Sequence, residues 1–231
     1  MNNRAVAACL AVLCACGAPT MASAQEAAAW SVDGRVGVVS DYRDRGYTLS
    51  AGDAVVQGEA TLSHASGGYA GLWASGIEEY GMGPDGDGAT IEVTLYAGWA
   101  GSTAGFDIDL GVWANVYPDG DDVNYVEFPV QIGRTFGAAT FSSGVVWAPS
   151  QTGTGDAANT WVWTRADYAP DSWPVSLHAR IGHEDGGFAP DGKTDWLVGL
   201  QAPLGPFTLG IDWVDSDTED NALVASVFWG F

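Results

Sequence analysis

The sequence is poor in positive charge, in long apolar segments and, beyond its first residues, in cysteine. Lysine occurs once, at Lys193, and the 231-residue chain has a formal net charge of −21. Nucleic-acid phosphates bind Lys and Arg, so we expect no nucleic-acid partner for so acidic a chain. The negative net charge also argues against electrostatic binding to an anionic surface. Aromatic residues make up 12% of the chain, which indicates an ordered fold rather than a disordered acidic polymer.

All three cysteines lie within the first 16 residues. This start has the parts of a secretory signal, namely Arg4, the apolar stretch 5–18 and the small-residue cleavage motif 22–24. The sequence therefore predicts a cleaved signal peptide at residues 1–24 and a mature chain without cysteine, which suits an oxidising compartment. Two alternatives are a lipoprotein acylated at Cys16 and a retained transmembrane helix. The apolar stretch is shorter than the ~20 residues that span a bilayer, which disfavours the helix.

From Trp30 onward the chain shows short segments with a period of two and no helical periodicity. Such alternation is typical of β-strands with one apolar face. The C-terminal segment is the clearest example, because every second residue back from Phe231 to Leu223 is apolar. Glycine, proline and aspartate separate the segments. We predict twelve strands, at residues 30–41, 54–65, 68–78, 89–100, 105–117, 123–134, 138–148, 159–168, 174–184, 194–202, 206–215 and 221–231.

The connections between these segments alternate in length. Those after even-numbered strands are short, such as 65–68 and 101–104, whereas most of those after odd-numbered strands are longer and acidic, such as 42–53 and 185–193. Short periplasmic turns, longer outer loops and an even strand number are typical of transmembrane β-barrels. Aromatic residues near the strand ends fit the two aromatic girdles of a membrane protein. We therefore predict an all-β fold with a single antiparallel transmembrane β-barrel of about 12 strands in residues 25–231; a soluble β-sandwich is the alternative.

The polar faces of most predicted strands carry charged residues that would point into the barrel lumen. Acids outnumber bases among them, and rings of acidic side chains favour cations. Eight strands leave no open channel and sixteen leave an aqueous one, so twelve strands are compatible with an open pore or a closed barrel. The lumen candidates are Asp33, Arg35, Glu59, Glu92, Asp107, Asp109, Glu127, Arg180 and Asp212, and further inward-facing residues are Arg165, Asp167, His178 and Asp195.

Residues 40–46, Ser-Asp-Tyr-Arg-Asp-Arg-Gly, end the first strand and begin its loop. Together with Gly-Tyr-Ala-Gly-Leu-Trp-Ala-Ser at 68–75 and Leu-Tyr-Ala-Gly-Trp at 95–99, this motif resembles the TorF family, a group of proteobacterial outer-membrane porins with signal peptides. In that family the residue between the two arginines is commonly aromatic, whereas Asp44 stands there in this chain. The resemblance implies an outer-membrane barrel more directly than it implies a transported solute. The residues of this first-loop motif are Asp41, Tyr42, Arg43, Arg45 and Gly46.

The first-loop motif places charges of both signs at the mouth of the first strand. We favour the interpretation that the loop is ion-paired and holds the barrel rim. The alternative is a loop that folds toward the lumen and forms a constriction.

The sequence favours an outer-membrane channel for passive diffusion of small cationic or neutral solutes, and a closed barrel with a structural or surface-binding role is the alternative. The expected partners are outer-membrane lipid, small solutes and the barrel-assembly machinery, which would recognise Trp229 and Phe231 in the last strand. We predict no enzyme activity, catalytic residue, metal or cofactor. A hydrolase that uses His183, and weak divalent-cation binding at 85–88 or 215–220, are the alternatives.

Overall fold

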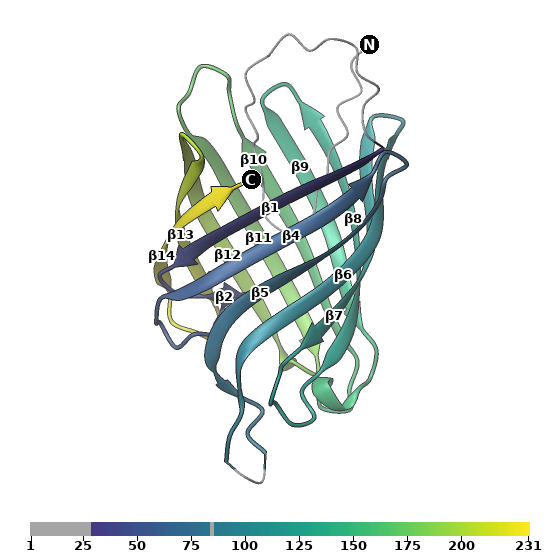
Figure 1. Cartoon of the computed structure of the whole chain (residues 1–231), viewed down its shortest axis with the longest axis vertical. Helices are drawn as coiled ribbons and strands as arrows, with labels where there is room; N and C mark the ends of the chain where they lie inside the picture. The colour runs from purple at the N-terminus through teal and green to yellow at the C-terminus, as the bar shows by residue number, and fades with distance from the viewer. Residues whose placement is uncertain (1–28, 84–85) are drawn as a thin grey trace.

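The computed structural model describes residues 29–83 and 86–231 of the chain. The predicted signal peptide at 1–24 lies outside the described residues, and its cleavage stays a prediction. Within the described residues, no helix is long and apolar enough to cross a membrane. Twelve antiparallel strands form one closed barrel, which confirms the predicted fold class (Figure 1).

The barrel strands agree with the predicted segments to within three residues at each end, except for the tenth, which begins five residues early. Two short strands, β2 and β3, form a separate hairpin in the first loop. The elements are β1 (Trp30–Val39), β2 (Arg43–Asp44), β3 (Tyr47–Thr48), β4 (Val55–His64), β5 (Gly68–Tyr80), β6 (Ala89–Thr103), β7 (Phe106–Val116), β8 (Tyr125–Phe136), β9 (Ala139–Ala148), the 3-10 helix η1 (Thr152–Thr154), β10 (Asn159–Tyr168), β11 (Ser176–Gly186), β12 (Ala189–Leu204), β13 (Phe207–Ser216) and β14 (Ala222–Gly230).

The last strand closes the barrel against the first. Strand β14 pairs antiparallel with β1, from Arg35 opposite Gly230 to Val39 opposite Ser226. The pairing extends to the final residue, because the Phe231 N–H donates to the Gly34 carbonyl at 2.9 Å and the Gly34 N–H donates back at 3.0 Å. Closure leaves no unpaired sheet edge, so the C-terminal residue is held in the sheet rather than frayed.

The two ends of the barrel differ in their connections. At one end, called the turn end here, residues 65–67, 104–105, 137–138 and 205–206 join neighbouring strands tightly. At the other, the loop end, lie the longer connections 40–54, 81–88, 117–124, 149–158 and 217–221. The predicted alternation of short and long connections therefore holds for most of the barrel. The exceptions are the seven-residue connection 169–175 at the turn end and the two-residue connection 187–188 at the loop end.

The predicted long loop at residues 185–193 is wrong. Strands β11 and β12 continue past the predicted ends, and Gly186 pairs with Ala189 beyond a β-bulge. At the start of this extension Glu184, the last residue of the predicted strand, pairs with Lys193, and both side chains are fully buried on the lumen side. The acidic and glycine-rich composition looks like a surface loop, but here the charges are satisfied inside the barrel.

The barrel is apolar outside and polar inside. Leu223 and Val32 are 69% and 65% exposed on the outer surface, whereas Lys193 and Glu184 are 0% and 1% exposed. A water-soluble β-sandwich has the opposite arrangement, with its apolar side chains inside. A transmembrane β-barrel has an outward apolar band and a polar interior, as this chain does.

Candidate functional site: a hairpin inside the barrel

The first loop forms a tight hairpin because its two turn residues adopt left-handed backbone conformations. Asp44 pairs with Tyr47, which leaves Arg45 and Gly46 as the two turn residues, with φ angles of 47° and 91°. A two-residue hairpin turn of type I′ requires positive φ at both positions. A Cβ atom added to Gly46 would lie 2.8 Å from Ser216 Cβ on β13. The glycine of the motif is therefore needed both for its φ angle and for close approach to the barrel wall.

Asp41 holds the base of the hairpin together. Its carboxylate accepts hydrogen bonds from Arg43 Nε at 2.6 Å, from Thr48 Oγ1 at 2.7 Å and from Ser50 Oγ at 3.2 Å. Burial raises the pKa of the Asp41 carboxyl, but the hydrogen bonds and the charge of Arg43 outweigh burial and hold this pKa below its ordinary value. The ionised form of Asp41 is therefore the one that stabilises the hairpin.

Acid is expected to loosen the hairpin. Because its pKa is lowered by folding, Asp41 contributes stability above the ordinary carboxyl pKa of about 4, and this contribution is lost as pH falls through the folded value. Proteolysis within residues 41–50 should therefore become faster in the acid range. Asp41→Asn should give fast cleavage at neutral pH and remove this acid dependence, while Asp53→Asn, an exposed acid of the same loop, should not. An unchanged acid profile in Asp41→Asn would contradict this role.

The tip of the hairpin is anchored by a buried double ion pair. The Arg45 guanidinium donates to Glu127 on β8 and to Glu184 on β11, each at 2.8 Å. Its planar group also lies 5.0 Å from the Trp161 ring centroid. Arginine suits this position because its guanidinium can reach two carboxylates and stack on an aromatic face at once.

The single lysine of the chain supports the same anchor. Lys193 Nζ lies 2.8 Å from Glu184 Oε2, donates to the Arg45 carbonyl at 2.6 Å and lies 3.6 Å from the Tyr47 ring centroid. The hairpin therefore lies in the lumen, as the alternative interpretation of the first loop has it. The hairpin is also ion-paired, as the favoured interpretation predicts, but the ion pairs bind its tip to the lumen wall and not to the barrel rim.

One side of the lumen is apolar and supports the hairpin. Val39, Val214 and Val224 form a buried cluster, and Tyr42 and Phe228 pack against it. Val224 and Phe228 belong to β14, so the inner face of the last strand is only partly polar. The Tyr42 hydroxyl reaches across the lumen and donates to Glu92 Oε2 on β6 at 3.0 Å.

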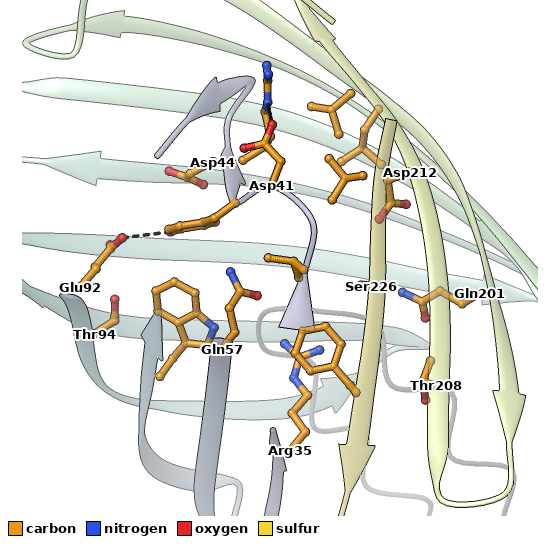
Figure 2. A pocket seen from close by; sticks show the side chains of 18 of the residues that line it. Arg35, Asp41, Asp44, Gln57, Glu92, Thr94, Gln201, Thr208, Asp212 and Ser226 are labelled. Carbon is orange, nitrogen blue, oxygen red and sulfur yellow. Dashed lines mark hydrogen bonds and ion pairs between the residues drawn. The ribbon is translucent and has the colours of Figure 1, made fainter. Parts of the chain in front are cut away.

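Between the hairpin and the turn end, the lumen contains a cavity of about 500 Å³. Figure 2 shows Gln57, Glu92 and Thr94 on one wall, facing Gln201 and Thr208 on the other. The hairpin acids Asp41 and Asp44 lie above the cavity in this view, and Arg35 lies below. The lining also includes Pro206 of the β12–β13 turn, so the cavity extends to the turn end. We name it the turn-end cavity.

The structure places the nine predicted lumen residues on the inner face of the strands, where most are paired. Five of them, Arg35, Glu92, Glu127, Arg180 and Asp212, line the turn-end cavity. Four lie outside its lining, namely Glu59 on β4, Asp109 on β7, and Asp33 and Asp107 near the turn-end starts of β1 and β7. The pairs are Arg35–Glu59 at 3.0 Å, Arg180–Asp195 at 3.0 Å, His178–Asp212 at 2.6 Å, Tyr69–Asp109 at 2.6 Å and Ser102–Asp107 at 2.5 Å.

Sequence reasoning does not place three residues of the hairpin anchor, Arg45, Glu184 and Lys193, in the lumen. The predicted segments put Glu184 at the end of a strand and Lys193 in a loop, and the favoured interpretation of the first loop puts Arg45 at the rim. Glu184 continues the inward alternation of His178 and Arg180, and this parity could have identified it. No comparable signal locates Arg45, because its partners lie 82 and 139 residues further along the chain.

The other predicted sites lie outside this network. Trp229 and Phe231 are 42% and 61% exposed on the outer surface, with ring centroids 5.1 Å apart, and their role in assembly stays a prediction. His183 is exposed and its Nδ1 lies 3.1 Å from Thr194 Oγ1. Within residues 29–83 and 86–231, no group of three or more His, Cys, Asp or Glu residues could hold a metal ion.

Comparison with known proteins matches the chain to one family over residues 23–228, a family described as "Bacterial protein of unknown function (Gcw_chp)". The chain belongs to the Gcw_chp family. No curated protein matches it. Membership covers all the described barrel strands except the end of β14.

Solved structures similar to this Gcw_chp protein include two porins and an outer membrane channel. A KdgM porin has a TM-score of 0.60 at 8% identity, and the match covers 87% of this chain and 98% of that one. A NanC porin has a TM-score of 0.53 at 11% identity, covering 87% and 98%. The COG4313 outer membrane channel from Pseudomonas putida F1 has a TM-score of 0.50 at 12% identity, covering 87% and 95%. At these identities the likeness is one of fold.

Proposed function

We propose that this protein is an outer-membrane channel for passive diffusion of small cationic or neutral solutes, with the β2–β3 hairpin as its constriction. The observation that carries the proposal is the cavity of about 500 Å³ inside a closed barrel, between the hairpin and the turn end, with both polar and apolar side chains in its lining. Polar groups that a solute could contact line this space. Gln57, Thr94 and Gln201, for example, are lining residues with polar side chains.

We also propose that the protein lies in the outer membrane and that it belongs to the TorF-type porins. A signal peptide at 1–24 would direct the chain across the inner membrane, and the C-terminal strand with Phe231 would be recognised by the barrel-assembly machinery. The exposed apolar side chains of the strands would face outer-membrane lipid. The first-loop motif supports membership in the TorF-type porins, whose name implies the same activity.

Conductance across planar bilayers tests the channel. The purified protein should give steady single-channel currents, and a KCl gradient should give a cation-selective reversal potential because lumen acids outnumber bases. Asp107→Asn should reduce this selectivity, whereas Asp171→Asn, an exposed acid of the β10–β11 turn outside the lumen, should leave it unchanged. Anion-selective or unselective currents would contradict the cation preference.

A closed barrel with a structural or surface-binding role is the second candidate. It is favoured by the anchor of the hairpin tip, because Asp44 and Arg45 line both the turn-end cavity and a second cavity at the loop end. The buried pairs of Arg45 to Glu127 and Glu184 hold the hairpin between these two cavities. A folded barrel that never conducts, with or without the hairpin anchor, would support this candidate over the channel.

A further inference from the structure

A second cavity of about 240 Å³ lies on the loop-end side of the hairpin. Its lining comes from the hairpin, from the end of β5, from the β7–β8 connection and from the β11–β12 turn. We name it the loop-end cavity. A solute that enters the barrel from the loop end would meet this cavity before it reaches the hairpin tip.

Four aromatic rings form a continuous wall of the loop-end cavity. The Tyr80 and Tyr117 ring centroids lie 5.0 Å apart, those of Tyr117 and Tyr125 lie 6.2 Å apart, and those of Tyr125 and Phe188 lie 4.9 Å apart. All four residues line the cavity. The faces of aromatic rings carry partial negative charge and attract cations.

Carboxylates complete the lining. Glu78, Glu79 and Asp44 line the cavity, and Glu78 and Glu79 are exposed. The one basic residue in the lining, Arg45, is paired with Glu127 and Glu184 and also lies 3.6 Å from Asp44, which leaves Glu78 and Glu79 without a basic partner in the lining. The cavity therefore combines an aromatic wall with an excess of negative charge.

The barrel already holds one of its own cationic side chains, Lys193, with the same kinds of groups, an aromatic ring and a carboxylate. The Lys193 ammonium lies 3.6 Å from the Tyr47 ring centroid and 2.8 Å from a Glu184 oxygen, and it is fully buried. An aromatic face and a carboxylate thus replace water around an ammonium group immediately beside the loop-end cavity. Purely apolar cavities offer no such electrostatic compensation for a desolvated charge.

We propose that the loop-end cavity binds an organic cation, namely an ammonium group that carries short apolar substituents. The rings would contact the substituents and the cationic centre, and the carboxylates would balance its charge. This inference rests on the proposed channel for its biological role, since the site would collect cationic solutes ahead of the constriction. The binding site itself is a property of the folded barrel and can be measured without conductance.

Calorimetry on the full-length protein in detergent tests the proposal with two probes of equal shape. Choline carries the charge, and 3,3-dimethyl-1-butanol is its neutral isostere. Choline should bind at millimolar concentrations or below, and the isostere should bind at least about tenfold more weakly, because only choline gains the attraction to rings and carboxylates. Equal affinities would overturn the proposal, since an apolar cavity alone would then explain binding. Absence of choline binding would overturn it as well.

Two variants with matched controls locate the site. Tyr80→Leu should weaken choline binding about tenfold. Tyr168→Leu should not, because Tyr168 is equally exposed, at 43% against 42%, but lies at the turn end. Glu78→Gln should weaken binding several-fold, whereas Asp156→Asn, an exposed loop-end acid outside the cavity lining, should not. Unchanged affinity in both cavity variants, shown to be folded by heat-modifiable gel migration, would overturn the assignment.

Currents recorded on the same preparations separate the two proposals. Choline binding by a protein that never conducts would support the site and contradict the channel. Conductance without choline binding would support the channel and overturn the site.

Discussion

Replacing Arg45 with alanine is expected to release the hairpin tip from the lumen wall and to raise single-channel conductance several-fold. The guanidinium is buried and bound at 2.8 Å to both Glu127 and Glu184. Removing one partner of a buried ion pair typically costs about 3–5 kcal/mol, because the remaining charge is left in a poorly solvated site. Alanine keeps a Cβ atom at the left-handed position of residue 45, so the variant reports the lost guanidinium rather than a change in backbone preference.

Hydrogen exchange of the hairpin amides measures this release independently of conductance. Loss of about 3 kcal/mol corresponds to a protection factor lower by roughly 10². Arg165→Ala is the matched control, because Arg165 is also a lumen arginine but its ion pair is with Asp167 on its own strand. Arg45→Lys should give an intermediate result, since an ammonium is a point charge and cannot bridge two carboxylates as a guanidinium does. Wild-type exchange and conductance in Arg45→Ala would show that another contact holds the hairpin.

Gly46→Ala is expected to displace the hairpin even though it removes no polar contact. At φ of 91° an L-residue is strained by about 1–2 kcal/mol. The added Cβ would also lie 2.8 Å from Ser216 Cβ and 3.1 Å from Asp195 Cβ, so the turn or strand β13 would have to move. We expect faster proteolysis of the hairpin and higher conductance than in the wild type.

Gly52→Ala separates the two causes of the Gly46 effect. Gly52 lies in the same loop and has a similar φ of 82°, but an added Cβ would meet nothing within 4 Å. This variant should show the backbone strain alone, as a modest loss of loop protection without a change in conductance. If both variants behaved alike, the close approach of the turn to β13 would not contribute to hairpin docking.

The fold was accessible from the sequence because a membrane barrel is specified locally. Outward apolar and inward polar residues alternate along each strand, and every second residue from Leu223 to Phe231 faces outward in the structure as predicted. Turn residues such as Ala104-Gly105 mark the strand ends. The one large error in strand boundaries is at residues 185–193, because the acidic, glycine-rich composition of this segment is also typical of a solvated loop.

The inner face of each strand was also accessible, since it follows from parity. Parity placed Asp107, Asp109 and Arg180 on the lumen side, and continued one step further it would have included Glu184. It could not show which of these charges are neutralised. Many of these charges are neutralised by ion pairs between neighbouring strands, such as Arg35 of β1 with Glu59 of β4 and Arg180 of β11 with Asp195 of β12.

The sequence by itself determined that the protein is an antiparallel β-barrel. The alternation of apolar and polar residues, the alternation of short and long connections and the aromatic C-terminus can all be recognised from residues that are close together in the sequence. Only the tertiary structure decided where the first loop goes. The motif is compatible with a type I′ turn at Arg45-Gly46, but the position of this turn depends on Glu127 and Glu184, which barrel closure brings to the two terminal nitrogens of one guanidinium. Long-range electrostatic pairing leaves no periodic trace in a sequence, so the division of the lumen into two cavities appears only when the barrel is closed.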